Sequence, residues 1–225
     1  MKNVGIVLLS LVVLIAGCVQ GNQKASSVAQ DTAKQAAFEE MDLHHEESVK
    51  AFPAKTEGLG GQVLKPTIVD GIKVFEITSK EVRWEISPGK FIKGFAYNGQ
   101  IPGPEIRVRK GDKIRVILHN ELPESTSIHF HGVDVPNEMD GVPFITQPPV
   151  KPNQSFTYEF TVLDAPGTFM YHSHHNAEIQ VGKGLLGAFI VESESNGWDV
   201  EHTLIIGDGD LGYTLNGKGF PATSP

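Results

Sequence analysis

The chain has almost no cysteine: Cys18 is the only one among 225 residues. A single thiol excludes a disulfide within the chain. Long cationic runs are missing as well, because no block of five or more basic residues occurs and the formal net charge is −8. We therefore expect no nucleic-acid partner.

Several catalytic signatures are also missing. The sequence contains no nucleophile elbow, no phosphate-binding glycine loop of the P-loop type (G-x-x-x-x-G-K-S/T) and no Cys-x-x-Cys motif. After residue 65 it contains no long segment with the 3.6-residue period of an amphipathic helix. What remains there is a series of short apolar runs separated by turns.

The sequence has one strongly hydrophobic run, at its N-terminus. "MKN" is followed by "VGIVLLSLVVLIAG", which is too short for an ordinary membrane span of about 20 apolar residues. The run ends in "LIAGC", which resembles the bacterial lipoprotein cleavage box. That resemblance implies a signal peptide over residues 1–17, a lipidated Cys18 and a protein anchored in the cell envelope, facing outside the cytoplasm. A plain secretory signal and a short membrane anchor are the alternatives.

Residues 18–65 predict an extension rather than a folded core. "CVQGNQKASSVAQDTAKQAA" is small and polar, which is typical of a flexible or disordered tether. "FEEMDLHHEESVKAF" predicts a short helix that Pro53 closes. His44 and His45 are adjacent and would project about 100° apart on a helix, so a solvated polar helix is favoured over a metal site.

The region 66–192 has the pattern of an all-β domain. "KIRVILHN" and "SFTYEFTV" alternate between apolar and polar residues, with the two-residue period of a half-buried strand. Turn clusters such as "SPGK", "YNGQIPGPE" and "LDAPGT" separate such runs. Many short strands with frequent turns predict a β-sandwich or barrel. Residues 193–225 follow as a linker with one further strand, in "HTLIIGD".

Two His-x-His motifs are the strongest chemical signal in the domain. On a strand, residues two apart project from the same face. "HFH" therefore places His129 beside His131, and "HSH" places His172 beside His174. Imidazole is a ligand that suits Cu, Zn, Fe and Ni. Two such pairs in an all-β domain predict a metal site with four imidazole ligands.

The other histidines of the domain and the linker have less distinctive positions. His175 is adjacent to His174 and should project to the other side of the strand, in a supporting or surface role. His119 ends a predicted strand and His202 stands alone. For both of these we expect structural roles.

At this point a family resemblance becomes visible. "YNGQIPGPEIRVRKGDKIRVILHN", His-x-His-Gly, Asp-Gly-Val-Pro and "YHSH" occur in the order found in the first cupredoxin domain of multicopper oxidases. The resemblance covers residues 97–192 approximately and implies an antiparallel Greek-key β-sandwich over 66–192. "YTLNGKGFPATSP" resembles the opening of the next cupredoxin domain, so residues 193–225 would include the start of a second one.

The resemblance also implies copper ligands. In the family, the first motif gives one ligand to a type 2 copper and one to a type 3 copper, at positions that match His129 and His131. The second motif gives further type 3 ligands, at His172 and His174. Four more histidines come from a later domain, here a missing C-terminal domain or a second subunit. Asp140, in "EMDG", matches an acidic residue that helps deliver protons to oxygen, although a turn aspartate before glycine is an equal alternative.

One departure from the family limits what this chain does by itself. A type 1 blue copper needs a cysteine thiolate, but Cys18 occupies the lipidation position and Ser173 stands between the second pair of histidines. We therefore expect the N-terminal part of an oxidase, inactive alone. The full enzyme would couple one-electron oxidation of a phenol-like or metal-ion substrate to reduction of O₂ to water.

Two other functions are kept as alternatives. The first is a non-enzymatic copper-binding lipoprotein of the cell surface. The second is a cupin-type metal enzyme, because "PGTFMYH" faintly resembles a cupin motif. Against the cupin, the acidic ligand should follow the first His-x-His closely, whereas Glu138 lies seven positions after His131, and a second His-x-His is foreign to that pattern.

Overall fold

The computed structural model describes residues 16–194 and 197–223, with side chains of the first helix described at position 30 and from position 32 onward. The chain divides into two units, Met1–Lys50 and Ala51–Pro225. The signal peptide expected over 1–17 falls almost wholly outside the described residues, and so does the side chain of Cys18.

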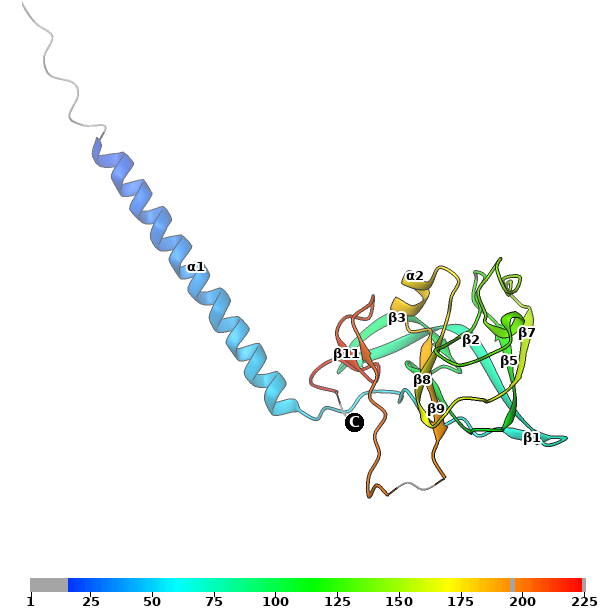
Figure 1. The fold of residues 1–225 in the computed structure, drawn as a ribbon. Coiled ribbons are helices and arrows are strands. Elements are labelled where there is room, and N and C mark those ends of the chain that lie inside the picture. The colour runs from blue at the N-terminus through cyan, green and yellow to red at the C-terminus, as the bar shows by residue number, and fades with distance from the viewer. Residues whose placement is uncertain (1–15, 195–196, 224–225) are drawn as a thin grey trace, which may run out of the picture. The chain divides into compact units, whose positions relative to one another are not determined.

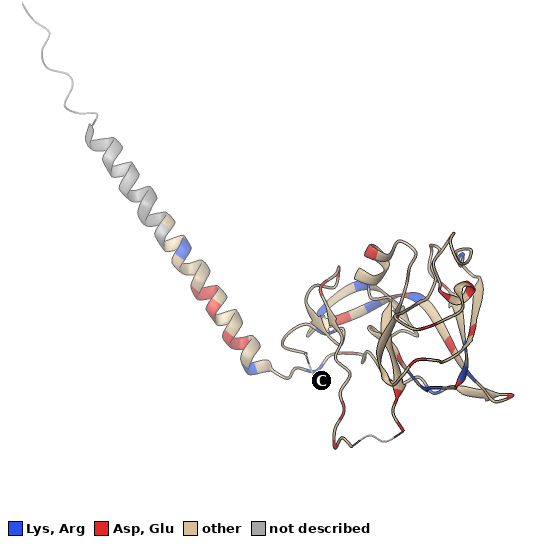
Figure 2. Cartoon of the chain, in the orientation of Figure 1, with Lys and Arg blue, Asp and Glu red and all other residues tan. Residues whose placement is uncertain are grey.

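The first unit contains α1 (Ala16–Ala51) except for its last residue, and α1 is one continuous helix (Figure 1). The sequence predicted a tether followed by a short helix, and the structure instead continues the helix through both. Alanine, glutamine and lysine are frequent in the supposed tether, and they are good helix formers. His44 and His45 are exposed, and charged residues recur along the described part of α1 (Figure 2). No described helix combines the length and the apolar character that a bilayer span needs.

The second unit contains two main β-sheets, which confirms the all-β sandwich (Figure 1). In the first sheet β1, β2, β5 and β7 lie in that order, and β3 pairs with β2. Its strands are β1 (Thr67–Val69), β2 (Ile72–Ser87), β3 (Lys90–Tyr97), β5 (Lys113–Asn120) and β7 (Ser155–Thr161). The second sheet has the order β4, β9, β8, β6. Its strands are β4 (Gly103–Arg109), β6 (His129–His131), β8 (Gly167–His172) and β9 (Leu186–Glu192).

The sheets are mixed, whereas the family resemblance implied an antiparallel sandwich. β2 runs parallel to β5 and β4 runs parallel to β9, while the other pairs of the two main sheets are antiparallel. Parallel neighbours cannot be joined by a hairpin and need a long crossover. Here the chain passes through other strands between the two members of each parallel pair, which supplies that crossover.

The core follows directly from the two-residue period. Along β5, the side chains of Ile114, Val116 and Leu118 are completely buried, and the residues between them are partly exposed. The corresponding inward faces of the other strands complete one apolar cluster between the sheets. In it the ring of Phe130 makes edge contacts with Tyr158, Phe160 and Phe189, with ring centroids 5.0–5.9 Å apart. Such tilted contacts are the arrangement that aromatic rings prefer.

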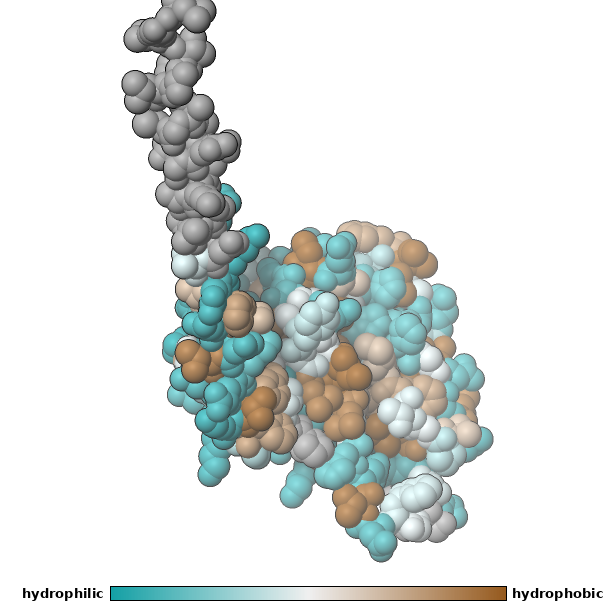
Figure 3. Space-filling model, turned by 90° about the vertical axis from the view of Figure 1, so that its left-hand side faces the viewer, coloured by the Kyte–Doolittle hydropathy of each residue, from teal (hydrophilic) through white to brown (hydrophobic). Residues whose placement is uncertain are grey.

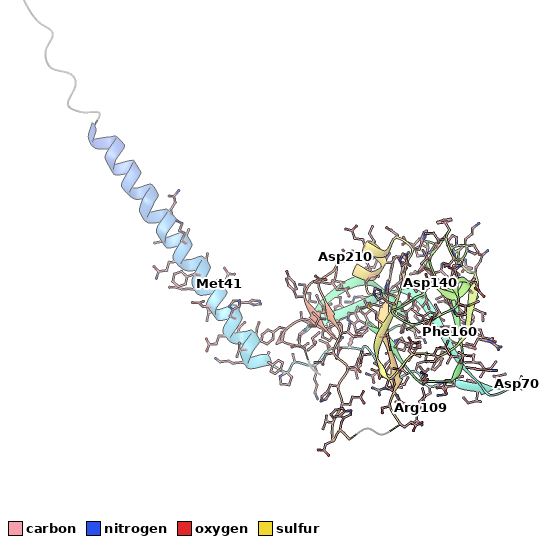
Figure 4. All side chains as sticks on the ribbon, in the orientation of Figure 1. Met41, Asp70, Arg109, Asp140, Phe160 and Asp210 are labelled. Carbon is pink, nitrogen blue, oxygen red and sulfur yellow. The ribbon has the colours of Figure 1, made fainter. Side chains whose placement is uncertain are left out.

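The strand ends that matter for the site gather at one end of the sandwich. β6 is followed by the short η1 (Asn137–Met139), and β8 leads to α2 (Ala177–Gly182). Asp140, directly after η1, lies toward the end of the sandwich where α2 projects, while Arg109 lies at the opposite end (Figure 4). The packed sheets therefore present the first and second histidine motifs on the same side of the domain.

The C-terminal segment packs against the sandwich through a buried lysine. The segment includes β10 (Ile206–Gly207) and β11 (Thr214–Leu215). Lys218 Nζ donates to the carbonyls of Glu57 and Glu85, at 2.7 and 2.8 Å, and lies over the ring of Trp84. The described residues of this segment thus contact the sandwich through Lys218, and the start of a second cupredoxin domain in 193–225 stays a prediction.

Apolar side chains also reach the surface of this unit, as brown areas in the space-filling view show (Figure 3). Large exposed ones in the C-terminal segment are Trp198, Val200, Leu204, Ile206, Tyr213 and Phe220. Single exposed apolar residues are ordinary on protein surfaces, but the segment leaves a series of them uncovered while it contacts the sandwich.

Candidate metal centre

The two histidine motifs meet because β6 and β8 are antiparallel neighbours. Their register places His129 opposite His172 and Phe130 opposite Tyr171. Phe130 and Tyr171 are completely buried in the core. Since successive side chains on a strand alternate between faces, the histidines of both strands project from the other face, toward the surface.

All four histidines of the two motifs lie together. The ring of His129 is central, with its centroid 5.6 Å from His131, 5.3 Å from His172 and 5.2 Å from His174. The His131 and His172 rings are 5.4 Å apart, and the His172 and His174 rings are 6.2 Å apart. Four imidazoles from two chain segments therefore share one small region.

The nitrogens of one histidine pair are spaced for a single metal ion. His131 Nδ1 and His172 Nε2 are 3.2 Å apart. Two nitrogens bound to one ion at about 2.0–2.1 Å stand roughly 3 Å apart when the angle at the ion is about 100°. Ligand atoms of His129, His131 and His172 all lie within 4.8 Å of one another.

Backbone carbonyls fix two of the rings. His129 Nδ1 is 2.6 Å from the Asp140 carbonyl, and His172 Nδ1 is 2.8 Å from the Ser173 carbonyl. A carbonyl can only accept, so in both rings Nδ1 carries the proton and Nε2 presents its lone pair. This is the arrangement that orients a metal-binding imidazole and sets its tautomer.

The surroundings of His172 favour its neutral form. Burial is the main cause that lowers the pKa of His172 below its ordinary value. The Ser173 carbonyl opposes this effect, while the three neighbouring imidazoles lower the pKa further. Metal binding requires deprotonated nitrogen, so the same features that disfavour a cluster of imidazolium charges leave lone pairs free for a metal.

A tight turn holds the Asp140 carbonyl in place. Gly141 has φ +78°, and a Cβ there would come within 1.7 Å of the Ile128 carbonyl oxygen. Only glycine allows the turn to pass so close to the residue before His129. Asp140 also places a carboxylate oxygen 3.3 Å from His129 Nδ1. Asp140 thus contacts the site through both its backbone and its side chain.

The remaining histidines of the second unit lie elsewhere. The His175 ring contacts Phe144, with centroids 6.1 Å apart, and no ring contact is described between His175 and the four paired histidines. His119 Nδ1 lies 2.8 Å from Ser155 Oγ, across the β5–β7 pair. His202 lines a surface pocket beside Arg107 and Glu201.

Two residues of the site were missed by sequence reasoning. At Gly141 the sequence indicates only a turn, because the contact of Gly141 with Ile128 depends on the fold. Gln180 is completely buried behind the second motif and hydrogen-bonded to Ser173. Nothing in the pattern "AEIQVG" distinguishes this glutamine from a surface one, so no signal in the sequence identifies it.

The donor set fits copper. All of the ligand atoms that the cluster offers are imidazole nitrogens, which suit copper among the transition metals. Two of the rings are already fixed by carbonyls, and the 3.2 Å separation of His131 and His172 suits a shared ion. The exposed side of the cluster, at His131 and His174, leaves room for further ligands.

Comparisons with known proteins point to one family. A family model described as multicopper oxidase matches residues 78–196. The iron transport multicopper oxidase of Candida glabrata is 43% identical over 102 residues, covering 44% of this chain and 16% of that protein. Copper resistance protein A of Escherichia coli is 36% identical over 137 residues, covering 60% of this chain and 22% of that protein. The chain therefore spans less than a quarter of the length of either relative.

A solved structure supports the same relationship. The multicopper oxidase of Campylobacter jejuni, described as a metallo-oxidase, superposes with a TM-score of 0.62 at 28% identity, covering 75% of this chain and 41% of that one. The cupredoxin-like fold that the resemblance implied is thereby confirmed. These comparisons favour neither the non-enzymatic copper-binding protein nor the cupin.

The close approach of Gly141 to Ile128 generates a test. In Gly141→Ala the added methyl group collides with a backbone oxygen, so the turn shifts and His129 loses its carbonyl partner. We expect copper affinity to fall about 10- to 100-fold, measured by competition with a chromogenic chelator. Gly71→Ala is the matched control, because Gly71 has φ +79° and a Cβ there would meet nothing within 4 Å. Equal losses of affinity in the two variants would show that backbone strain alone is responsible.

Proposed function

Because this chain belongs to the multicopper oxidase family, we propose that its four paired histidines hold copper as one half of a cluster at which O₂ is reduced to water. The observation that carries the proposal is the pairing of His129 with His172 across β6 and β8, which brings both motifs to one face. The 3.2 Å separation of His131 Nδ1 and His172 Nε2 supports a shared copper.

Each histidine has a distinct part in this proposal. His131 and His172 would bind one type 3 copper between them. His129 would bind the type 2 copper through Nε2, since its Nδ1 donates to the Asp140 carbonyl. His174 would serve the second type 3 copper. Copper held there would supply the electrons that oxygen accepts. The hydrogen bonds to the Asp140 and Ser173 carbonyls hold the rings of His129 and His172 within this chain.

The other half of the ligands must come from outside the described histidine cluster. We propose a later cupredoxin domain or a second subunit as their source. In support, His131 and His174 are exposed. The nearby loop also carries Phe144 and Ile145, whose relative exposures are 79% and 80%. An apolar surface beside an open ligand set is suited to contact with a completing domain.

Electrons would enter at a type 1 copper outside this chain, because that centre needs a cysteine thiolate and Cys18 is the only cysteine. The relatives suggest the substrate class. One is named for iron transport, and another, from Agaricus bisporus, is named laccase-1. We propose a metal ion or a phenol-like compound as the reductant.

Asp140 is proposed to pass protons toward the oxygen site. Its side chain is 34% exposed, and its Oδ1 lies 3.3 Å from His129 Nδ1. The carboxylate therefore reaches both solvent and the edge of the cluster. Its backbone carbonyl holds His129 independently, so the two roles of this residue can be separated by changing the side chain alone.

We also propose that Cys18 is lipidated and anchors the protein to a membrane of the cell envelope, on the side facing away from the cytoplasm. The support is the sequence "LIAGC" after an apolar run. The polar α1 would then lie between the anchor and the folded domain in the chain order.

A first test of the proposed site compares two histidine positions that lie three residues apart, His172 and His175. His172→Ala removes the ligand that faces His131, so we expect copper affinity to fall at least about 10-fold. His175→Ala is the matched control and should bind copper like the unchanged chain. Affinity is measured by chelator competition on the full chain. If His175→Ala loses as much affinity as His172→Ala, the assignment of ligands is wrong.

A second test measures oxygen uptake. The chain alone, supplied with Cu(II) and a phenol, should show no intense blue colour and no sustained oxygen consumption. Adding the later domains that supply the other copper ligands and the type 1 copper should produce both. In that completed enzyme, Asp140→Asn should slow oxygen consumption about 10²-fold or more, because a carboxamide cannot exchange the proton. Copper content should stay unchanged, since the backbone carbonyl remains.

Two results would contradict this second group of expectations. Sustained, copper-dependent oxygen uptake by the chain alone would show that it needs no completing domain. Full activity of Asp140→Asn with normal copper content would restrict Asp140 to holding the turn and the His129 ring.

A third test addresses the anchor. Cys18→Ala removes the thiol that lipidation requires, so the protein should appear in the soluble fraction or remain unprocessed. Cell fractionation followed by immunoblotting measures this distribution. A Cys18→Ala protein that stays with the membranes at its normal size would support an uncleaved N-terminal anchor instead.

A further inference from the structure

A buried glutamine lies behind the second histidine motif with every hydrogen-bonding group in use. Gln180, on α2, has no exposed surface. Its Nε2 donates to Glu124 Oε1 at 2.6 Å and to the Ser125 carbonyl at 2.8 Å. Its Oε1 accepts from Ser173 Oγ at 2.5 Å and from Thr126 Oγ1 at 2.8 Å. These four bonds use the full capacity of a primary amide.

These four bonds connect the segments that carry the histidines. Ser173 lies between His172 and His174, and its carbonyl accepts a hydrogen bond from His172 Nδ1–H. Residues 124–127 lead into the strand of His129. Ser127 also accepts from the backbone N–H of His174, at 3.4 Å. A single side chain therefore fixes both approaches to the cluster.

The chemistry of the partners makes an amide specific at this position. Ser173 and Thr126 each need an acceptor, while Glu124 and the Ser125 carbonyl each need a donor. Only an amide supplies two acceptor and two donor positions from one end of a side chain. An apolar residue would remove the acceptor that the completely buried Ser173 and Thr126 hydroxyls share, and the donors to Glu124 and Ser125. Leaving buried polar groups with fewer partners is costly. A carboxylate would satisfy the hydroxyls but would face the carboxylate of Glu124.

We propose that Gln180 is a positioning residue for the copper cluster: by holding Ser173 and the 124–127 segment together, it sets the position of the His172 ring and of the His174 backbone. The inference rests on the proposed function insofar as these histidines bind copper. It adds that the hydrogen bonds of Gln180 maintain the positions of the histidines, which are half of the proposed ligand set. They do so before the domain that supplies the other ligands makes contact.

The test exchanges the amide and the carboxylate across the hydrogen bond from Gln180 to Glu124. Gln180→Glu places two carboxylates within hydrogen-bonding distance and removes both donors, so the network should open. Glu124→Gln alone should have a smaller effect, because its new amide can still accept from Gln180. In the double variant the amide at 124 donates to the carboxylate at 180, which still accepts from Ser173 and Thr126. We therefore expect copper affinity to fall about 10- to 100-fold in Gln180→Glu and to recover substantially in the double variant.

Two spectroscopic readouts separate positioning from general stability. In the metal-free full chain, nitrogen NMR of the histidine rings should show His172 protonated at Nδ1, and Gln180→Glu should mix its tautomers. In the Cu(II)-loaded chain, the electron paramagnetic resonance parameters should change with Gln180→Glu and return in the double variant. Val116→Ala, in the apolar core on β5, is the control, because Val116 takes no part in the Gln180 hydrogen bonds: it should lower the thermal unfolding temperature and leave both spectra unchanged.

The NMR comparison and the double variant each have a result that would contradict the positioning role of Gln180. An unchanged His172 tautomer in folded Gln180→Glu would overturn the proposal, and so would a double variant that recovers thermal stability without recovering either spectrum. If the unchanged chain binds no copper, the proposed function fails. The metal-free NMR comparison then still decides whether Gln180 positions His172.

Discussion

The antiparallel pairing of β6 with β8 is the constraint on which the site depends. It sets His129 opposite His172 and, on the reverse face, Phe130 opposite Tyr171. The core therefore fixes the metal site indirectly. The buried rings of Phe130 and Tyr171 hold the two strands in one register, and a shift by one residue would exchange the buried and the exposed side chains of the shifted strand. The apolar packing energy of the sandwich thus determines which nitrogens face one another.

Pairing alone leaves each ring free to rotate, and a second set of contacts removes that freedom. The Asp140 carbonyl accepts a hydrogen bond from the His129 ring, and the Ser173 carbonyl accepts one from the His172 ring. Each carbonyl belongs to a segment that is itself constrained. Gly141 passes against the Ile128 carbonyl, while Ser173 is held by Gln180. Ordering an imidazole costs side-chain entropy. A fold that has already met this cost binds a metal with less reorganisation.

The sequence predicts those parts of this structure that follow from local periodicity or from a family pattern. Alternation predicted the buried face of β5, and the two His-x-His motifs identified the histidines that the fold brings together. The parallel pairs β2–β5 and β4–β9 depend on contacts between distant segments, which no local pattern encodes. The same holds for Gln180, because its burial results from the way α2 packs on residues 124–127. The length of α1 was underestimated because small polar residues suit both a tether and a helix.

The division between fixed and exposed rings explains how a half-site remains intact. His129 and His172 are partly buried and bonded to carbonyls, while His131 and His174 are exposed. The lowered pKa of His172 limits the charge that the cluster accumulates without metal, because several adjacent imidazolium groups would repel one another. The buried side of the cluster thus carries the polar contacts that set its geometry, and the exposed side leaves room for further ligands. With this arrangement, another domain or subunit can supply the remaining ligands from the exposed side. The contacts that hold His129 and His172 are then not disturbed.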